Sequence, residues 1–504
     1  MTVVALLLSA AAAGLATVRW ARVAQREHYI AGSVSRFAVR WWLRRPPNPV
    51  LAATAVVALI VGFWSRPLAL LALAAVAAGP VGLRLRGRTS PLRWTPRLRR
   101  LVATAAVFEA GALAATALTG TSEMTAPLVA ALVPVIVDAA VLAMVPVERA
   151  LSQKYVRQAA DTLRRVSPRV VAITGSYGKT STKEHVRDLV SGSFEVVASP
   201  ASFNNRLGLA KAVNDAVGPG TEVFVAEMGT FAQGEIADLC TWIKPTVSVL
   251  TAVGPVHLER FGSLDAIAEA KSEIFAGASQ VVINADDQRV SEVAARKLEP
   301  AAVLRCSASD PTAAVFVESR DRGFEVRING GAIGVVTADV FPVNVACAVG
   351  AALALGVPVD AIASRLSRLG APAHRAQVSE AGSGVTIIDD TYNSNPDGAA
   401  AALRLLDRMG SDAAHKVVVT PGMIELGARQ TAENEIFGAA AGQIATHLVV
   451  VGHSNKAALL AGAQGTDAEV VVVADRDAAS KFVRTILSSG DLVLYENDLP
   501  DHHP

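Results

Sequence analysis

Cysteine is scarce in this chain. Three cysteines occur in 504 residues, and Cys240, Cys306 and Cys347 lack the spacing of metal ligands. This scarcity argues against a disulfide framework and against a four-cysteine zinc ribbon, and it is typical of buried residues in a reduced protein. The chain also has no evident internal repeat or low-complexity tract, apart from alanine-rich apolar stretches.

Acidic residues are nearly absent from the first 100 positions. This segment holds 15 Arg, no Lys and one acid, Glu27, whereas the rest of the chain holds 32 basic and 44 acidic residues. The net charge of +2 therefore hides a basic N-terminal part. Five apolar stretches of nearly membrane-spanning length lie before residue 150: Thr2–Val18, Pro49–Trp64, Leu68–Leu83, Leu101–Leu118 and Ala126–Val147. We expect an α-helical membrane domain of about five spans.

Charge and length predict how these stretches are arranged. The Arg-rich loops 19–45 and 84–100 favour the cytoplasmic side, which puts the N-terminus outside and the chain after Val147 inside. These loops would also attract anionic lipid headgroups, although topology determinants are the plainer interpretation. The second and third stretches are short and predict a hairpin around 65–67. The first stretch resembles a signal peptide in length, but its charges follow the apolar run, which favours a retained anchor. We expect a multi-pass protein of the plasma membrane.

Two acids fall inside the apolar stretches. Glu109 lies eight residues after Leu101, and Asp138 lies eight residues before Pro146. In antiparallel helices both would lie ~12 Å from the cytoplasmic end, at about 1.5 Å per residue. Intramembrane acids are costly and often functional. Two interpretations stay open: the acids bind Arg or a cationic group of a lipid-linked substrate, or they line a helix interface with water or hydroxyl partners.

From Leu151 onward, β-rich runs alternate with helical ones. The predicted strands are Val170–Thr174, Val223–Glu227, Val247–Thr251, Val281–Asn284, Val385–Asp389, Lys416–Thr420, Leu448–Val451, Val470–Val473 and Leu492–Tyr495. This alternation indicates an α/β fold with mainly parallel sheets, and 313–337 predicts a small antiparallel insertion. A Gly-, Pro- and Ala-rich boundary at 368–374 separates two soluble domains. We expect a transmembrane domain over 1–150, a central ATP-binding domain over 151–372 and a doubly wound, Rossmann-like C-terminal domain over 373–504.

The ATP prediction rests on Ile173 to Lys183, ITGSYGKTSTK, which joins a predicted strand to a predicted helix. Glycines in such a turn let backbone N–H groups face a phosphate, Lys179 can reach the terminal phosphates, and the Thr180 hydroxyl can ligate magnesium. Ile173 stands where the common pattern has Gly, so the loop is a shortened variant. An ordinary strand-to-helix connection is the alternative. The predicted nucleotide-binding set in this loop is Gly175, Ser176, Gly178, Lys179, Thr180 and Ser181.

Three further residues are candidate metal ligands because they follow strands or lie near strand ends. Glu227 ends the run VFVAE, and His257 follows a strand in TAVGPVHLERFGS. A solvated acid and a structural histidine are the alternatives for these two. Lys271, in EAKSEIF, suits a cation site only if carbon dioxide converts its amine to a carbamate, an anionic oxygen donor.

Several motifs occur together in one order: GSYGKTSTK, FNNRLGLA, EMGTFAQGEI, VGPVHLERFGS, AKSEIF, NADD, HR at His374 and Arg375, and DDTYNSNPD. This set, over roughly 170–427, resembles the Mur ligase family. It is most similar to the type that adds D-alanyl-D-alanine to the UDP-linked muramoyl tripeptide. The resemblance implies an ATP-dependent amide ligase with a central ATP-binding domain and a C-terminal domain that closes over the site.

The resemblance also implies roles for individual residues. Lys179 would hold the β and γ phosphates, Thr180 and Glu227 would bind magnesium, and His257 with a carbamylated Lys271 would organise a second metal. Three residues would contact the nucleotide: Asn344 near the adenine, Arg375 at the γ-phosphate and Asp390 from the C-terminal domain. Five residues would contact the substrate: Asn204 and Asn205 on the acceptor-facing loop, and Tyr392, Asn393 and Asn395. Lys179, Lys271 and His257 form the expected catalytic set.

The implied reaction is acyl activation. A substrate carboxylate attacks the γ-phosphate to give an acyl phosphate and ADP, and an amine then displaces phosphate. We expect as partners a carboxylate-bearing cell-envelope acceptor, an amino acid or dipeptide, and the lipid bilayer; we expect no nucleic acid.

The chain departs from the family pattern in three places. Membrane stretches occupy the position of the UDP-gripping domain, TPGMIELG at 420–427 lacks the usual Gly-Asp start, and LYENDLPD at the C-terminal end lacks Lys-Gly-Ser. The sequence therefore leaves undecided whether the acceptor is a soluble UDP-linked molecule and whether the amine is D-alanyl-D-alanine. A lipid-linked acceptor, a poly-amino-acid product and a non-catalytic nucleotide-binding scaffold are the alternatives. A relative that amidates lipid II would be expected to carry a four-cysteine zinc ribbon, against which the three scattered cysteines argue.

Overall fold

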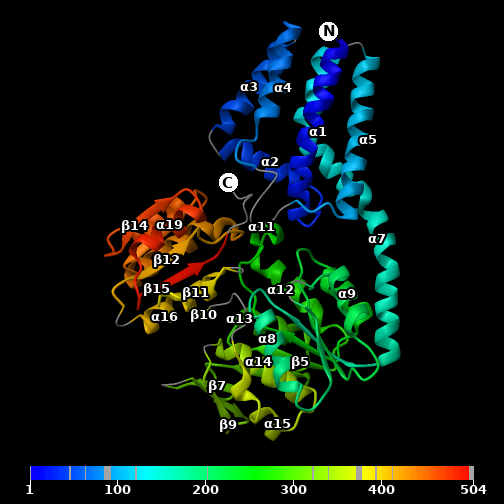
Figure 1. Ribbon diagram of the computed structural model, residues 1–504. Helices are drawn as coiled ribbons and strands as arrows, with labels where there is room; N and C mark the ends of the chain where they lie inside the picture. Colours follow the sequence, from blue (N-terminus) through cyan, green and yellow to red (C-terminus); the bar gives the residue numbers. More distant parts are fainter. Residues whose placement is uncertain are drawn as a thin grey trace. The chain divides into compact units, whose positions relative to one another are not determined.

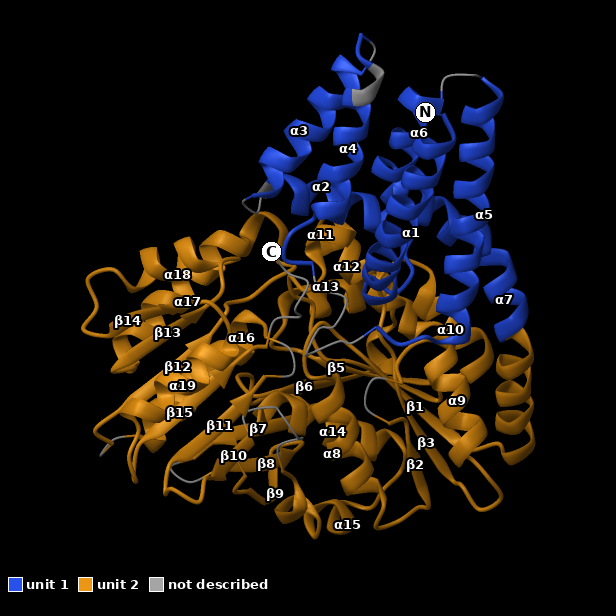
Figure 2. Ribbon diagram, turned by 45° about the horizontal axis from the view of Figure 1, so that its top comes forward, with its two compact units in different colours: residues 1–152, 499–504 blue, residues 153–498 orange. Residues whose placement is uncertain are grey.

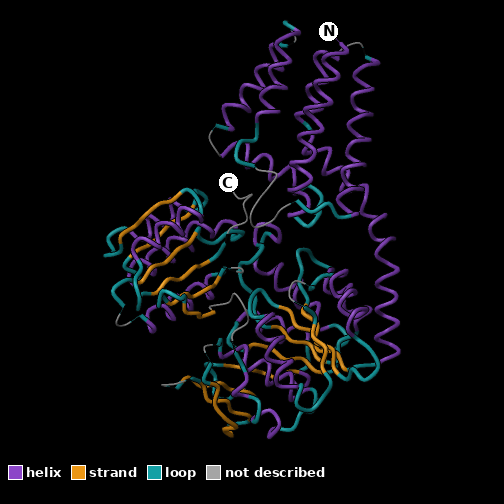
Figure 3. Tube along the Cα trace, viewed as in Figure 1, coloured by secondary structure: helices purple, strands orange, loops and turns teal. Residues whose placement is uncertain are grey.

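The computed structural model describes residues 2–44, 47–62, 64–83, 92–119, 122–200, 203–320, 323–338, 340–370, 377–391, 394–410 and 413–498. The chain divides into two compact units, residues 1–152 and residues 153–498 (Figures 1 and 2). The first unit is helical, and the second contains two β-sheets with their helices (Figure 3). The predicted boundary at 372 lies outside the described residues.

The described residues of the first unit form seven helices: α1 (Thr2–Arg26), α2 (Ser33–Arg44), α3 (Asn48–Val61), α4 (Arg66–Ala78), α5 (Pro96–Leu118), α6 (Ser122–Ala131) and α7 (Val133–Val166), the last of which continues into the second unit. Small side chains of α1 let its neighbours approach closely. Helix α2 buries Val34, Phe37, Ala38 and Trp41, which lie on one face at helical spacing. Many apolar side chains on the outer faces of α1 and α5 stay exposed, Leu7 and Val107 among them.

Within the described residues, the structure supports two or three spans in place of about five. Two helices, α1 and α5, are long and apolar enough to cross a membrane, and α6 with α7 adds a third if this pair, bent by 64°, forms one span. The bend falls at Leu132, just before Pro134, because proline cannot continue the helical hydrogen bonds. Helices α3 and α4 have 14 and 13 residues, about 20 Å against a hydrocarbon core of ~30 Å. They pack together as the predicted hairpin.

The two acids of the apolar stretches have polar partners inside the first unit. The Thr17 hydroxyl of α1 donates to the Glu109 carboxylate. Asp138 accepts hydrogen bonds from the backbone N–H groups of Val34 and Ser35, at 3.2 and 2.8 Å, and from the Ser35 hydroxyl. Asp138 therefore caps the N-terminus of α2. These contacts favour the helix-interface interpretation over the ligand-binding one.

The larger sheet of the second unit has nine strands in the order β2-β3-β1-β4-β5-β6-β7-β8-β9. They are β1 (Arg169–Thr174), β2 (Val196–Ala198), β3 (Val223–Glu227), β4 (Val247–Leu250), β5 (Gln280–Asn284), β6 (Val303–Ser307), β7 (Val315–Ser319), β8 (Phe324–Ile328) and β9 (Gly331–Val336). The pairings from β2 to β7 are parallel, and β7-β8-β9 is antiparallel, which confirms the predicted insertion.

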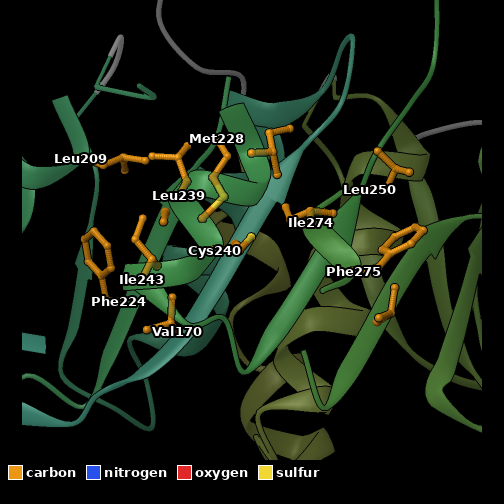
Figure 4. Close-up of a cluster of buried hydrophobic side chains, with 14 of the residues drawn as sticks. Val170, Leu209, Phe224, Met228, Leu239, Cys240, Ile243, Leu250, Ile274 and Phe275 are labelled. Atoms are coloured by element: carbon orange, nitrogen blue, oxygen red, sulfur yellow. The ribbon is translucent and has the colours of Figure 1, made fainter. Parts of the chain in front are cut away.

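Helices cover both faces of this sheet and so bury its strands on both sides. On one face lie α9 (Arg206–Ala216), α10 (Glu235–Ile243), α12 (Leu264–Ser272) and α13 (Gln288–Lys297), and on the other lie α8 (Lys179–Val190) and α14 (Pro342–Ala354). Val170 faces the first layer and Val171 the second, as strand alternation requires. Figure 4 shows the first core, to which Cys240, Phe224 and Met228 belong. All three cysteines are buried and free, as predicted.

The shorter elements of this region connect the layers. They are α11 (Leu258–Phe261), α15 (Val359–Ala363), and the 3₁₀ turns η1 (Glu273–Phe275), η2 (Pro300–Ala302) and η3 (Leu366–Arg368).

The smaller sheet has the order β10-β11-β15-β12-β13-β14 and is parallel except for the pair β10-β11. Its elements are β10 (Gln377–Glu380), β11 (Thr386–Asp390), α16 (Pro396–Met409), β12 (Lys416–Thr420), η4 (Gly427–Arg429), α17 (Gln430–Ile444), β13 (His447–Val451), α18 (Lys456–Ala463), β14 (Glu469–Val473), α19 (Arg476–Ile486) and β15 (Leu492–Glu496). The nine predicted parallel-sheet strands are confirmed within a residue at each end, whereas β2, β6 and β10 were not predicted.

Candidate functional site: a phosphate loop and its neighbours

The phosphate loop joins β1 to α8. Strand β1 ends at Thr174, and α8 begins at Lys179 with Gly178 as its N-cap in the left-handed region, at φ +77°. A side chain at Gly178 would also collide with the Asn344 amide of α14. The position therefore requires glycine on two counts. The exposed N–H groups at the start of α8 favour an anion at this point.

Other residues hold this loop against the segment after β4. The Ser176 N–H donates to the Ala252 carbonyl at 2.7 Å, and the Ser176 hydroxyl exchanges hydrogen bonds with the backbone of Gly254. Lys179 folds back over the loop, and its Nζ donates to the Gly175 carbonyl at 2.6 Å. The Lys179 amine therefore lies against the phosphate loop.

Glu227 lies beside the phosphate loop because β3 pairs with β1, with Ile173 in register with Glu227. Its carboxylate is buried and accepts hydrogen bonds from the Thr180 hydroxyl at 3.0 Å and from the Asn204 amide at 3.3 Å. A hydroxyl and a carboxylate oxygen at this separation match the oxygen ligands that Mg²⁺ prefers. Among the described residues, no three His, Cys, Asp or Glu side chains gather into a metal site, so an ion here would depend on hydroxyl and phosphate oxygens as well.

Lys271 lies on α12 and is buried. Burial, together with the positive charge of Lys179, holds the pKa of the Lys271 amine well below its usual value. Lys271 and Lys179 therefore belong to one electrostatic environment. The lowered pKa favours the neutral amine, which is the form that reacts with carbon dioxide.

His257 has a partner that the sequence pattern did not indicate. Its Nδ1 pairs with the Glu425 carboxylate from the segment TPGMIELG, and the Glu425 carbonyl accepts from the Leu258 N–H at 3.1 Å. Phe231 packs its ring edge-on at 4.9 Å from the His257 ring. Glu425 lies 168 residues from His257, so no local spacing could have signalled this contact.

A cavity of about 420 Å³ opens beside the phosphate loop. Tyr177, Gly178 and Asn344 line it together with Asp390 and further residues of the smaller sheet region. Burial raises the pKa of the Tyr177 hydroxyl, so this side chain stays a neutral donor. The lining also includes Ser181, Asn395 and Asp397, and burial raises the pKa of the Asp397 carboxyl.

The remaining predicted site residues divide into two groups. Asn205 and Asn395 are helix caps, since their side chains accept from the N–H groups of Gly208 and Gly398 at 3.0 Å. Asn395 also lines the cavity, and Asn204 contacts Glu227. Arg375, Tyr392 and Asn393 lie outside the described residues.

The geometry of Gly178 leads to a test of the loop. We expect Gly178→Ala to destabilise the protein by about 1–2 kcal/mol, because alanine is strained in the left-handed conformation. We also expect the variant to bind ADP at least about tenfold more weakly, about 1.4 kcal/mol or more, because the Asn344 side chain must move. Gly277→Ala is the matched control, since Gly277 has φ +80° but open space around its Cβ position. Calorimetric titration with ADP checks both variants; wild-type affinity in Gly178→Ala would contradict the assignment of the loop.

Comparisons with known families agree with this geometry. Residues 173–352 match the Mur ligase middle domain, and residues 374–495 match the Mur ligase, glutamate ligase domain. The chain is 36% identical over 365 residues to the UDP-N-acetylmuramoyl-tripeptide–D-alanyl-D-alanine ligase of Mycobacterium tuberculosis (strain ATCC 25618 / H37Rv), covering 64% of this chain and 69% of that protein. It is 30% identical over 293 residues to the ligase of the same name from Escherichia coli (strain K12), covering 56% and 64%.

Solved structures give the same result. MurF ligase from Thermotoga maritima in complex with ADP superposes with a TM-score of 0.58 at 26% identity, covering 69% of this chain and 80% of that one. MurF from Acinetobacter baumannii gives a TM-score of 0.59 at 24% identity, covering 69% and 77%, and so supports the fold. The chain therefore belongs to the Mur ligase family and is an ATP-dependent ligase that forms amide bonds.

Proposed function

We propose that the second unit activates a carboxylate of a peptidoglycan precursor with ATP and joins it to an amine. The observation that carries this proposal is the conjunction of the phosphate loop, Lys179 and the carboxylate of Glu227 at one sheet edge. The acceptor carboxylate attacks the γ-phosphorus, the bond to the β-phosphate oxygen breaks, and ADP leaves. An unprotonated amine then attacks the acyl carbon and displaces inorganic phosphate.

The residues around the loop have distinct proposed roles. Lys179 swings from the Gly175 carbonyl to the β and γ phosphates and offsets the charge that accumulates between them. Backbone N–H groups of Gly178, Lys179 and Thr180 hold the phosphates, with Ser176 fixing the loop and Ser181 lining the cavity. Asn344 and Asp390 line the space proposed for the adenosine, while Arg375 is proposed at the γ-phosphate.

Divalent metal is proposed at the oxygen atoms of Thr180 and Glu227, with His257 and Lys271 organising a second ion. Bound magnesium supplies charge neutralisation for the phosphates during transfer. His257 would exchange its contact with Glu425 for that role. The burial and lowered pKa of Lys271 support carbamylation, in which the neutral amine attacks carbon dioxide and loses a proton.

The acceptor is proposed to be lipid-linked or otherwise presented at the membrane. Helices α1 and α5 are long and apolar enough to cross a bilayer, with exposed apolar side chains on both, and they stand in a part of the chain that neither family domain matches. The relatives are named for a UDP-linked tripeptide and D-alanyl-D-alanine. For this chain the amine is proposed more broadly as an amino acid or dipeptide, because the segments 420–427 and 494–501 depart from the family pattern.

The ligase is tested by amine-dependent phosphate release from ATP. Detergent-purified full-length protein is supplied with membrane-lipid extract or UDP-linked muramoyl tripeptide, and with a panel of amino acids and dipeptides. We expect release with the lipid extract, and a loss of about 10²–10³-fold in Lys179→Ala because the phosphates lose their cation. The exposed Lys211, which pairs with Asp215, provides the control Lys211→Ala.

The outcomes separate the alternatives. Release with the UDP-linked acceptor alone would contradict the lipid-linked proposal. Release that exceeds the acceptor concentration with one amino acid would indicate a poly-amino-acid product. Tight ATP binding without release under any combination would contradict the acyl-transfer function proposed for this site.

Carbamylation of Lys271 is tested by chemical rescue. We expect Lys271→Ala to lower turnover at least about tenfold, since an oxygen donor beside the metal is lost. Acetate or propionate should restore part of the rate because it fits the vacated space and supplies a carboxylate. The same acids should not rescue Lys179→Ala. Failure of every short carboxylate to rescue Lys271→Ala, with ADP affinity preserved, would argue against the carbamate.

A further inference from the structure

Lys183 is a fully buried cation beside the proposed metal site. It lies one helical turn after Lys179 on α8, and its side chain is 0% exposed. Its Nζ lies 3.4 Å from Oε2 of Glu227 and 3.3 Å from Oε1 of Glu184. Within the described part of the chain, Nζ has no hydrogen-bond acceptor with good geometry. A buried ammonium held by charge alone is costly unless its counter-charge is close.

Glu227 is the main buried counter-charge of Lys183. Glu184 is partly exposed and also binds the Arg187 guanidinium at 2.5 Å, so its charge is shared with a surface cation. The Glu227 carboxylate is buried, and the Oε2 atom that faces Lys183 also accepts from Thr180. Lys183 and a metal ion at Thr180 and Glu227 would therefore depend on the same carboxylate oxygen.

The surroundings of Glu227 are rich in positive charge before any nucleotide binds. Lys179 begins α8 and its amine lies against the phosphate loop, and Lys183 contacts the carboxylate directly. One buried carboxylate against two ammonium groups leaves the site electropositive, which disfavours a bare divalent cation and favours the phosphates of a nucleotide.

We propose that Lys183 is a built-in counter-ion of Glu227 that keeps divalent metal out until the nucleotide brings its own negative charge. The inference rests on the metal role proposed above for Glu227 and Thr180. In the nucleotide-free protein Lys183 neutralises Glu227, and the metal competes with it at a disadvantage. When the phosphates bind at the loop, their charge offsets Lys179 and Lys183 together, so the oxygen of Glu227 becomes available to an ion that the phosphates also hold. Lys183 is thus a positioning residue that couples metal binding to nucleotide binding.

The test measures metal binding rather than turnover. Mn²⁺ is titrated into nucleotide-free, detergent-purified full-length protein, and free Mn²⁺ is followed by electron paramagnetic resonance. Lys183→Met keeps the apolar length of the side chain and removes its charge. We expect at least about tenfold tighter Mn²⁺ binding in this variant, because a unit charge a few ångströms from a divalent ion is lost. Lys183→Arg keeps the charge and should bind Mn²⁺ as weakly as wild type.

Two controls assign the effect to Glu227 and to the nucleotide. Adding Glu227→Gln to Lys183→Met should abolish the gain in Mn²⁺ affinity. Saturating ADP should raise Mn²⁺ affinity strongly in wild type and much less in Lys183→Met, because the variant has already lost the competing cation. If Lys183→Met proves unfolded by circular dichroism, Lys183→Gln, which keeps a polar end group, is measured in its place.

The outcomes distinguish this inference from the function on which it rests. Wild-type protein that binds Mn²⁺ only with ADP, together with tight binding in the neutral variants, supports the role of Lys183. Unchanged Mn²⁺ affinity in folded neutral variants, with Mn²⁺ and ADP still bound by wild type, overturns that role and leaves the metal site intact. Wild-type protein that fails to bind Mn²⁺ even with ADP overturns the metal site and, with it, the role of Lys183.

Discussion

The parallel pairing of β1 with β3 and β4 is the constraint on which the rest of the site depends. In a parallel sheet all strands end at the same edge, so this pairing brings the phosphate loop, Glu227 and the segment after β4 together although they are far apart in sequence. Hydrogen bonds from Ser176 to Ala252 and Gly254 then fix the loop. Gly178 turns the chain into α8, and the N–H groups at the start of this helix favour an anion.

Charge balance is the second organising principle. The start of α8 supplies two lysines near one buried carboxylate, and this excess of positive charge suits a polyanionic substrate. Burial and the nearby charge of Lys179 lower the pKa of Lys271, which favours its neutral amine. Lys179 instead donates to a backbone carbonyl of the loop.

Sequence periodicity predicted the parallel sheets well because their valine-rich strands are buried on both faces. It missed β2, β6 and β10, which are short or partly exposed and so carry a weak apolar signal. It gave too many spans because the second and third stretches were counted as spans although they were already seen to be short, and because apolar composition does not reveal the bend before Pro134. It could not find Glu425 or the Lys183–Glu227 pair, since these contacts join residues that only the fold brings together.

The central claim is that the phosphate loop serves to activate a carboxylate. The most direct measurement is oxygen transfer from an acceptor whose carboxylate is labelled with ¹⁸O, with the released phosphate analysed by mass spectrometry. An acyl phosphate leaves one carboxylate oxygen on phosphorus when the amine displaces it, so the account predicts one ¹⁸O atom in each released phosphate. Phosphate without ¹⁸O, released in step with amide formation, would contradict the account.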